Sequence, residues 1–151
     1  MLPAQVVLFI HVASAIVLVG GSVASNVLGG LARRAGDLER RRTLVAAGAP
    51  FSRMTTIAVP VTTVTGLITL YLFGYSVTEL WVLGTGAVIL VLAAIQILYW
   101  NKVAPQIHEA LNSGDDDTAV TLMRDPKGIA FGRLEVGLGF LIVALMVIRP
   151  R

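Results

Sequence analysis

The chain has 151 residues, of which 56% are hydrophobic and 14% charged, and its formal net charge is +3. Its mean hydropathy of +0.81 excludes an ordinary soluble domain, which could not bury so much apolar surface. The sequence contains no cysteine, which excludes disulfide bonds and thiolate metal sites.

Four apolar runs take up most of the sequence, at about residues 3–29, 54–75, 80–100 and 129–148. Each meets or approaches the roughly 20 residues that a helix needs to cross a hydrocarbon core about 30 Å thick. We therefore predict an all-α integral membrane protein, an antiparallel four-helix bundle that forms a single transmembrane domain over residues 1–151. No positive charge precedes the first run, and the run is longer than a signal-peptide core, so we expect it to remain as the first helix.

The first run contains His11, which lies about 13 Å along the expected helix. An ionisable side chain inside a membrane span is costly and is a functional candidate for that reason. The imidazole could ligate heme iron or copper, bond a quinone or carry a proton. The alternative is a structural histidine that bonds a threonine or a carbonyl across the bundle, and the residues leave both interpretations open.

Few other side chains can complete a site around His11. The second histidine, His108, follows the third run at its cytoplasmic end and cannot share a metal with His11 in one subunit. Met146 and Tyr71 are expected at the depth of His11 and are candidates for a second axial ligand, as is a second copy of His11 in a dimer. Copper prefers a cluster of Met or His, and the four methionines and two histidines of the chain are a thin supply for it.

Small and polar residues at helical spacing predict which faces of the first two helices pack together. Association within a bilayer depends on such residues because they allow backbones to approach. The predicted packing face of the first helix consists of His11, Ser14, Leu18, Gly21, Ser25 and Leu28. The predicted face of the second consists of Thr55, Val59, Thr62, Gly66, Thr69 and Phe73.

Basic residues gather in two connections, at about residues 31–52 and 104–127. The positive-inside rule places both connections in the cytoplasm and both termini on the outer side of the membrane. Because the charge surplus is a topology signal, we do not expect a nucleic acid partner. We expect the first connection to lie on the anionic leaflet as a helix or to prolong the first helix. In the second, Asp117 is expected to cap a short helix from Thr118 to Arg124.

A further polar group is expected where the helices meet the cytoplasm. It consists of Asn26, Arg53, Thr56, Gln96, Arg133 and Glu135. These residues could form interfacial ion pairs, or they could bind a lipid headgroup, a quinone head or a partner subunit. The sequence has no nucleophile–base dyad, paired-carboxylate site or Walker loop, and we therefore lean against an enzyme.

Two segments resemble known membrane families. Residues 11–21 (HVASAIVLVGG) resemble the first helix of copper-resistance D-type proteins and of HemJ-like protoporphyrinogen oxidases, with Leu18 in place of a tryptophan. Residues 51–53 (FSR) and 64–67 (VTGL) are similar to elements of the second helix in the copper-resistance type. The resemblance implies a four-helix inner-membrane protein with His11 as the carried-over ligand of heme or copper. The third run lacks the lysine of those families, which argues against porphyrinogen oxidation.

Two functions from different classes follow from these observations. In the first, the protein is redox-associated and binds heme b, or as second choice copper, through His11. In the second, it is a non-catalytic accessory or assembly subunit of a larger membrane complex. The expected partners are the lipid bilayer and either further copies of the chain or that complex. A transporter or channel ranks third, because four helices with one histidine offer little to line a pathway.

Overall fold

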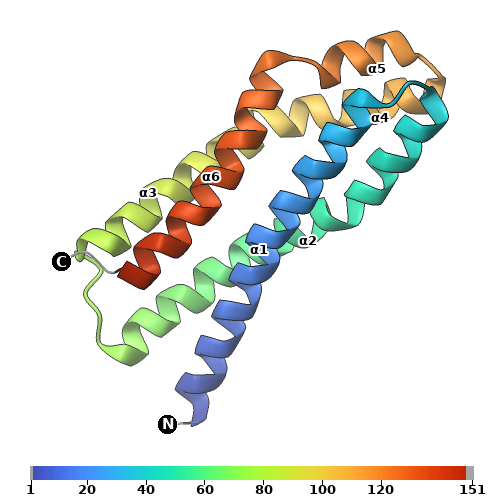
Figure 1. The fold of residues 1–151 in the computed structure, drawn as a ribbon. Helices are drawn as coiled ribbons and strands as arrows, with labels where there is room; N and C mark the ends of the chain where they lie inside the picture. The colour runs from blue at the N-terminus through green and yellow to red at the C-terminus, as the bar shows by residue number, and fades with distance from the viewer. Residues whose placement is uncertain (1, 149–151) are drawn as a thin grey trace.

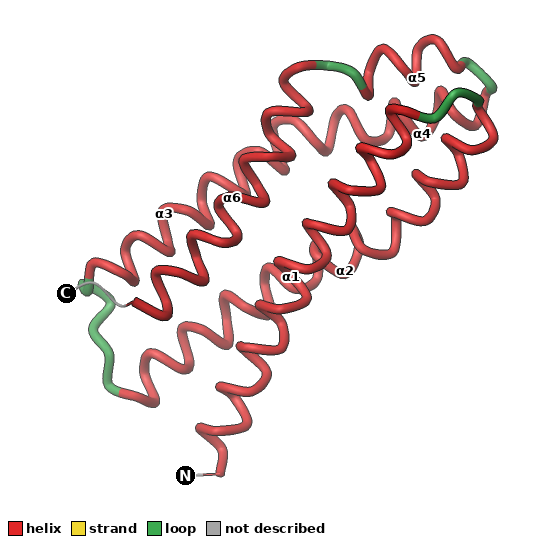
Figure 2. The backbone as a smooth tube through the Cα atoms, in the orientation of Figure 1, coloured by secondary structure: helices red, strands yellow, loops and turns green. Residues whose placement is uncertain are grey.

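The computed structural model describes residues 2–148 of the chain, and these residues form helices joined by short connections (Figures 1 and 2). Four of these helical stretches are long and apolar enough to cross a membrane, which confirms the predicted all-α class. In chain order the elements are α1 (Leu2–Arg34), α2 (Leu38–Phe73), α3 (Leu80–Ile95), the π-helical turn η1 (Gln96–Trp100), α4 (Asn101–Ser113), α5 (Asp116–Met123) and α6 (Pro126–Ile148).

The first connection, expected at 31–52 as a helix on the leaflet or as a prolongation of the first helix, is mostly helix, but most of that helix is the start of α2. Only residues 35–37 separate α1 from α2, and α2 starts 16 residues before the apolar run that predicted it. The side chain of Asp37 accepts a hydrogen bond from the backbone N–H of Arg40 at 2.8 Å and so caps the new helix. Charged residues therefore extend the second helix backward, whereas the apolar pattern marks only its membrane-spanning part.

The connection predicted at 104–127 is also mostly helical. The third span continues through η1 into α4, and α5 follows after a turn at Gly114, whose φ of 84° suits glycine. Asp115, two residues before the expected cap, accepts the hydrogen bond from Thr118 N–H that starts α5. At this end α4 and α5 pack on α2 through a cluster of Ala110, Leu111 and Ala119 with Leu38, Val45 and Ile107.

The long helices lie in the order α2, α1, α6, α3 (Figure 1). Helix α1 packs along α2, α6 packs on α1, and α3 packs on α6, while α2 and α3 lie at the two edges and pack little against each other. Neighbours in this row run antiparallel. The start of α1 and the end of α6 lie at one end of the molecule, and α4 and α5 lie at the other (Figure 1).

The close pairing of α1 and α2 uses the residues that the sequence predicted. Gly21 is buried against Thr55 and the backbone oxygen of Phe51, so closely that a Cβ at Gly21 would collide with the threonine hydroxyl. Further along the pair, the hydroxyl of Thr62 donates to that of Ser14 at 2.8 Å. The two predicted packing faces therefore meet.

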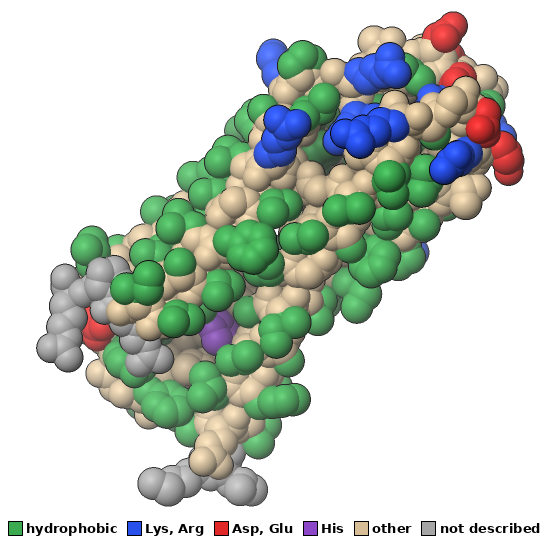
Figure 3. Space-filling view, in the orientation of Figure 1, with side chains coloured by type: hydrophobic (Ala, Val, Ile, Leu, Met, Phe, Trp, Pro, Cys, Tyr) green, Lys and Arg blue, Asp and Glu red, His purple; other side chains and the backbone are tan. Residues whose placement is uncertain are grey.

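Basic side chains gather at the end formed by α4 and α5, and the long body between the ends is covered by hydrophobic side chains (Figure 3). This is the charge distribution from which we predicted that both connections face the cytoplasm. Membrane-spanning segments in lipid require every backbone polar group to be paired, which continuous helices provide.

Two arginines of α2 bind carbonyl oxygens at the ends of other helices. The buried Arg41 donates from Nη2 to Ala35 O at 2.6 Å and from Nε to Ala32 O at 3.3 Å, and its other nitrogen pairs with Asp116 of α5. Arg42 donates from Nε to Leu111 O at 2.6 Å. Because the last carbonyls of a helix have no partner within it, these arginines hold the ends of α1 and α4 to α2.

We expect Arg41→Gln to lower the free energy of unfolding by roughly 2–3 kcal/mol, since it removes charge-assisted bonds to buried acceptors. Arg40→Gln, at the exposed neighbouring position, should change it by less than about 0.5 kcal/mol. Reversible unfolding in mixed detergent micelles measures both. Equal losses in the two variants would show that Arg41 contributes only its charge.

A side-chain hydrogen bond joins η1 to the residue before α6, and its contribution to stability depends on pH. Tyr99 donates its hydroxyl to Asp125 Oδ2 at 2.6 Å. This bond, followed by one from Lys127 N–H, holds the pKa of Asp125 below its ordinary value. A carboxylate whose pKa is lower in the folded state adds stability above its unfolded pKa, and that stability is lost as the pH falls through the folded value.

Tyr99→Phe should therefore raise the pKa of Asp125 toward its ordinary value and reduce the acid-dependent loss of stability. A carboxyl carbon NMR titration of the protein in detergent measures this shift. Tyr71→Phe is the matched control, because Tyr71 is 86% exposed. An unchanged titration of Asp125 in Tyr99→Phe would contradict the assignment of the cause.

Candidate functional site

His11 is buried in the seam between α1 and α2, with 8% of its surface exposed. Its Nδ1 atom lies 3.0 Å from the backbone oxygen of Thr62 and 3.4 Å from Oγ1 of Thr65. The seam places it there because the helical spacing of α1 puts His11 on the same face as Ser14 and Gly21, which also contact α2.

The hydrogen bond to Thr62 fixes which nitrogen of the ring carries the proton. A carbonyl oxygen can only accept, so Nδ1 is the donor. With Nδ1 as the donor, the neutral imidazole carries its lone pair on Nε2. Within residues 2–148, Nε2 has no hydrogen-bond partner. Metal-ligating histidines commonly show the same arrangement, with one N–H given to a carbonyl and the other nitrogen left to bind.

Gly66 of α2 forms the surface on which the imidazole lies. A Cβ built at Gly66 would be 2.9 Å from Cε1 and 3.3 Å from Nδ1 of His11. Side-chain carbons do not approach that closely, so any larger residue would displace the ring or separate the helices. Gly66 was predicted as a packing residue, and the structure shows that its partner is His11.

The two candidates for a second ligand differ in their exposure and in their distance from the seam. Tyr71 is 86% exposed on α2 and points away from the seam. Met146 is half-buried on α6, which packs on α1. In the antiparallel contact of α6 with α1, Gly132 faces Asn26, and Gly139 faces Val19. Each step of seven residues along α6 thus matches a step of seven back along α1. One further step brings Met146 level with Val12, which is next to His11 in the sequence.

Described residues do not assemble a conventional metal cluster. Within residues 2–148, no group of three or more His, Asp or Glu side chains is placed to hold a metal ion. His108 lies on α4 at the other end of the molecule from His11. A metal in the seam would thus depend on His11 as its one imidazole ligand within a subunit.

The polar group predicted at the cytoplasmic ends is dispersed over several contacts. Glu135 accepts a hydrogen bond from Trp100 Nε1 at 2.8 Å, and Gln96 donates to Asn101 at 3.2 Å. Asn26 donates to Ser22 O at 3.0 Å and lies against Gly132. Arg53 and Thr56 are exposed on α2, and Arg133 is exposed on α6. The Trp100–Glu135 bond and the Asn26–Gly132 contact link α6 to its neighbours, the other bonds lie within one helix, and together they do not converge on one site.

We expect Gly66→Ala to weaken the pairing of α1 and α2 by roughly 1–3 kcal/mol, because the new methyl group overlaps the imidazole. Gly86→Ala in α3 is the control, since a Cβ there meets no atom within 4 Å and alanine favours helix. Unfolding in mixed micelles gives both values. A Gly66→Ala protein as stable as the control would disprove the close fit of the ring.

The comparisons with known proteins place the chain in a family. No significant match was found among curated proteins or among solved structures. One family model, described as "Predicted integral membrane protein (DUF2269)", matches residues 5–150 and thus covers all four spans. The chain therefore belongs to this family of integral membrane proteins.

Proposed function

We propose that this integral membrane protein is redox-associated and binds heme b through Nε2 of His11 in the inner membrane. One observation carries the proposal: the 3.0 Å hydrogen bond from Nδ1 to Thr62 O occupies one ring nitrogen and leaves Nε2, with its lone pair, as the ring atom that can coordinate iron. The ring is also held against Gly66, so its orientation is fixed before any ligand binds. Fixed orientation reduces the entropy cost of binding.

The available ligands fit heme better than copper. Heme iron needs one or two axial ligands from the protein, and its other four come from the porphyrin. Copper needs a cluster of soft or imidazole donors, and no such cluster with three His, Asp or Glu forms within residues 2–148. Bound heme would supply one-electron chemistry, and Met146 or His11 of a second copy would be the further residue that holds it beside His11. The resemblance of residues 11–21 to the first helix of HemJ-like proteins supports the same choice.

The test is an optical spectrum of the full chain in mild detergent, first oxidised and then reduced with dithionite. We expect a Soret band that sharpens on reduction and that is lost in His11→Ala. His108→Ala is the matched control, because it removes the other histidine from α4 and should leave the spectrum unchanged. Met146→Leu should alter the band position if Met146 is the opposite ligand.

Two results would overturn the proposal. The first is a colourless protein even after expression with added heme precursor. The second is a heme band of the same intensity in His11→Ala, which would show that another group binds the iron. Thermal unfolding of each variant distinguishes loss of heme from loss of fold.

A second function, as an accessory or assembly subunit, is favoured by the open arrangement of the helices. Helices α2 and α3 lie at the edges of the row, and both expose large apolar side chains, including Ile57, Leu67 and Leu90. In a membrane these edges can pack against another protein as well as against lipid. A colourless chain that migrates with a larger complex in native gels of its own membrane would support this function over heme binding.

A further inference from the structure

A pocket of about 320 Å³ lies at the basic end of the molecule, between the last turn of α1 and the first turns of α6. Its volume is that of a small-molecule site. Four of the residues that line it are arginines: Arg33, Arg34, Arg124 and Arg133, and the others are Gly30 and Ile129. They come from three parts of the chain, since Arg33 and Arg34 end α1, Arg124 follows α5, and Arg133 lies on α6.

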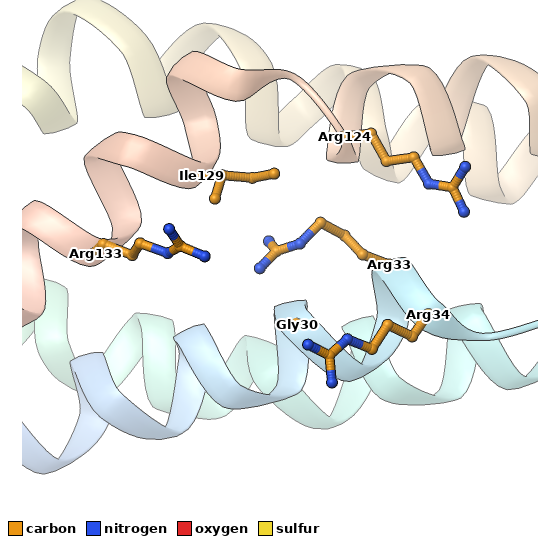
Figure 4. A pocket seen from close by; sticks show the side chains of 6 residues that line it. All are labelled: Gly30, Arg33, Arg34, Arg124, Ile129 and Arg133. Atoms are coloured by element: carbon orange, nitrogen blue, oxygen red, sulfur yellow. The ribbon is translucent and has the colours of Figure 1, made fainter.

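None of these four guanidinium groups has a hydrogen bond or ion pair with any residue in the range 2–148. Figure 4 shows Arg33 and Arg133 with their guanidinium groups turned toward each other across the pocket, while Arg124 extends along α5. Two like charges that face each other repel, and the repulsion is stronger beside a membrane than in water. The described part of the chain thus holds these positive charges together without an ion pair to any of them.

No carboxylate within residues 2–148 forms an ion pair with these four arginines. Asp116 pairs with Arg41, Asp125 accepts from Tyr99, and Glu135 accepts from Trp100. Arginine is the residue best suited to bind phosphate oxygens, because its planar fork donates two parallel hydrogen bonds. Within residues 2–148 the four guanidinium groups therefore remain free to bind an external anion.

We propose that this pocket binds a phosphate group between Arg33 and Arg133, with Arg34 and Arg124 at its rim. Arg133 lies seven residues into α6, about 10 Å from the start of that helix, and Ile129 adds an apolar wall between it and the helix start. A site with charge at one level and apolar surface beside it matches the headgroup layer of an anionic phospholipid. A free phosphate carries the same chemistry, and the experiment separates these two sources.

The key variant is Arg33→Gln with Arg133→Gln in the full chain. Its matched control is Arg40→Gln with Arg53→Gln, which removes the same charge from exposed positions on α2 outside the pocket. Thermal unfolding is measured in neutral detergent alone, with added phosphatidylglycerol, with added phosphatidylcholine and with inorganic phosphate. Native mass spectrometry on the same samples measures how much phosphatidylglycerol stays bound.

In neutral detergent alone, the pocket variant should be as stable as the wild type or more stable, because it removes an unbalanced repulsion. Phosphatidylglycerol should raise the melting temperature of the wild type and of the control but not that of the pocket variant. Its affinity should fall roughly tenfold or more in the pocket variant, since charge-assisted bonds are lost. A response to phosphatidylglycerol alone identifies a lipid headgroup, and an equal response to inorganic phosphate identifies the phosphate group as sufficient.

The proposal is overturned if no anion stabilises the wild type, if the pocket variant and the control respond equally, or if phosphatidylcholine acts as well as phosphatidylglycerol. Should the glutamine variant fail to fold, Arg33→Lys with Arg133→Lys replaces it. That variant keeps the charge but loses the two-pronged geometry, so its affinity should fall several-fold. An affinity equal to that of the wild type would overturn the site geometry.

Discussion

The close approach of α1 and α2 is the constraint on which the rest of the structure depends. A glycine on each helix faces a polar side chain of the other, with Gly21 against Thr55 and Gly66 against His11. Helices in lipid gain little from hydrophobic burial, so their pairing depends on such short distances and on hydrogen bonds between them. The bond from His11 to Thr62 O belongs to this same seam, and the geometry that orients the imidazole is therefore the geometry that holds the two helices together.

The two candidate sites lie far apart in the molecule and consist of different kinds of side chain. The seam around His11 is lined by glycine and by serine and threonine hydroxyls, lies among spans and offers one lone pair. The arginine pocket lies at the basic end and offers several charged donors. Helix α1 contributes to both, with His11 near its start and Arg33 in its last turn. Helix α6 joins them on the other side, because it packs on α1 and carries both Met146 and Arg133.

Sequence patterns predicted the spans and the packing faces because both are local and periodic. Apolar length predicted four membrane crossings, and spacing predicted that His11, Gly21, Thr62 and Gly66 lie in one seam. Helix was expected in both connections, but its bounds were not, since charged helix and charged loop have similar composition: residues 38–53 belong to α2, and Asp115 takes the capping position expected of Asp117. The arginine pocket could not be predicted, because Arg33 and Arg133 are brought together only by the packing of α6 on α1.

The π-helical turn η1 sets the rotation of α4 about its helix axis relative to α3. A single added residue rotates everything after it by about 100° around the helix axis, because an α-helix has 3.6 residues per turn. Trp100 closes η1 and bonds Glu135, and α4 then presents Ala110 and Leu111 to α5. Deleting one residue from 96–99 would turn those alanine and leucine side chains away from α5. The number of residues in η1 thus determines which face of α4 points toward α5 for a given orientation of α3.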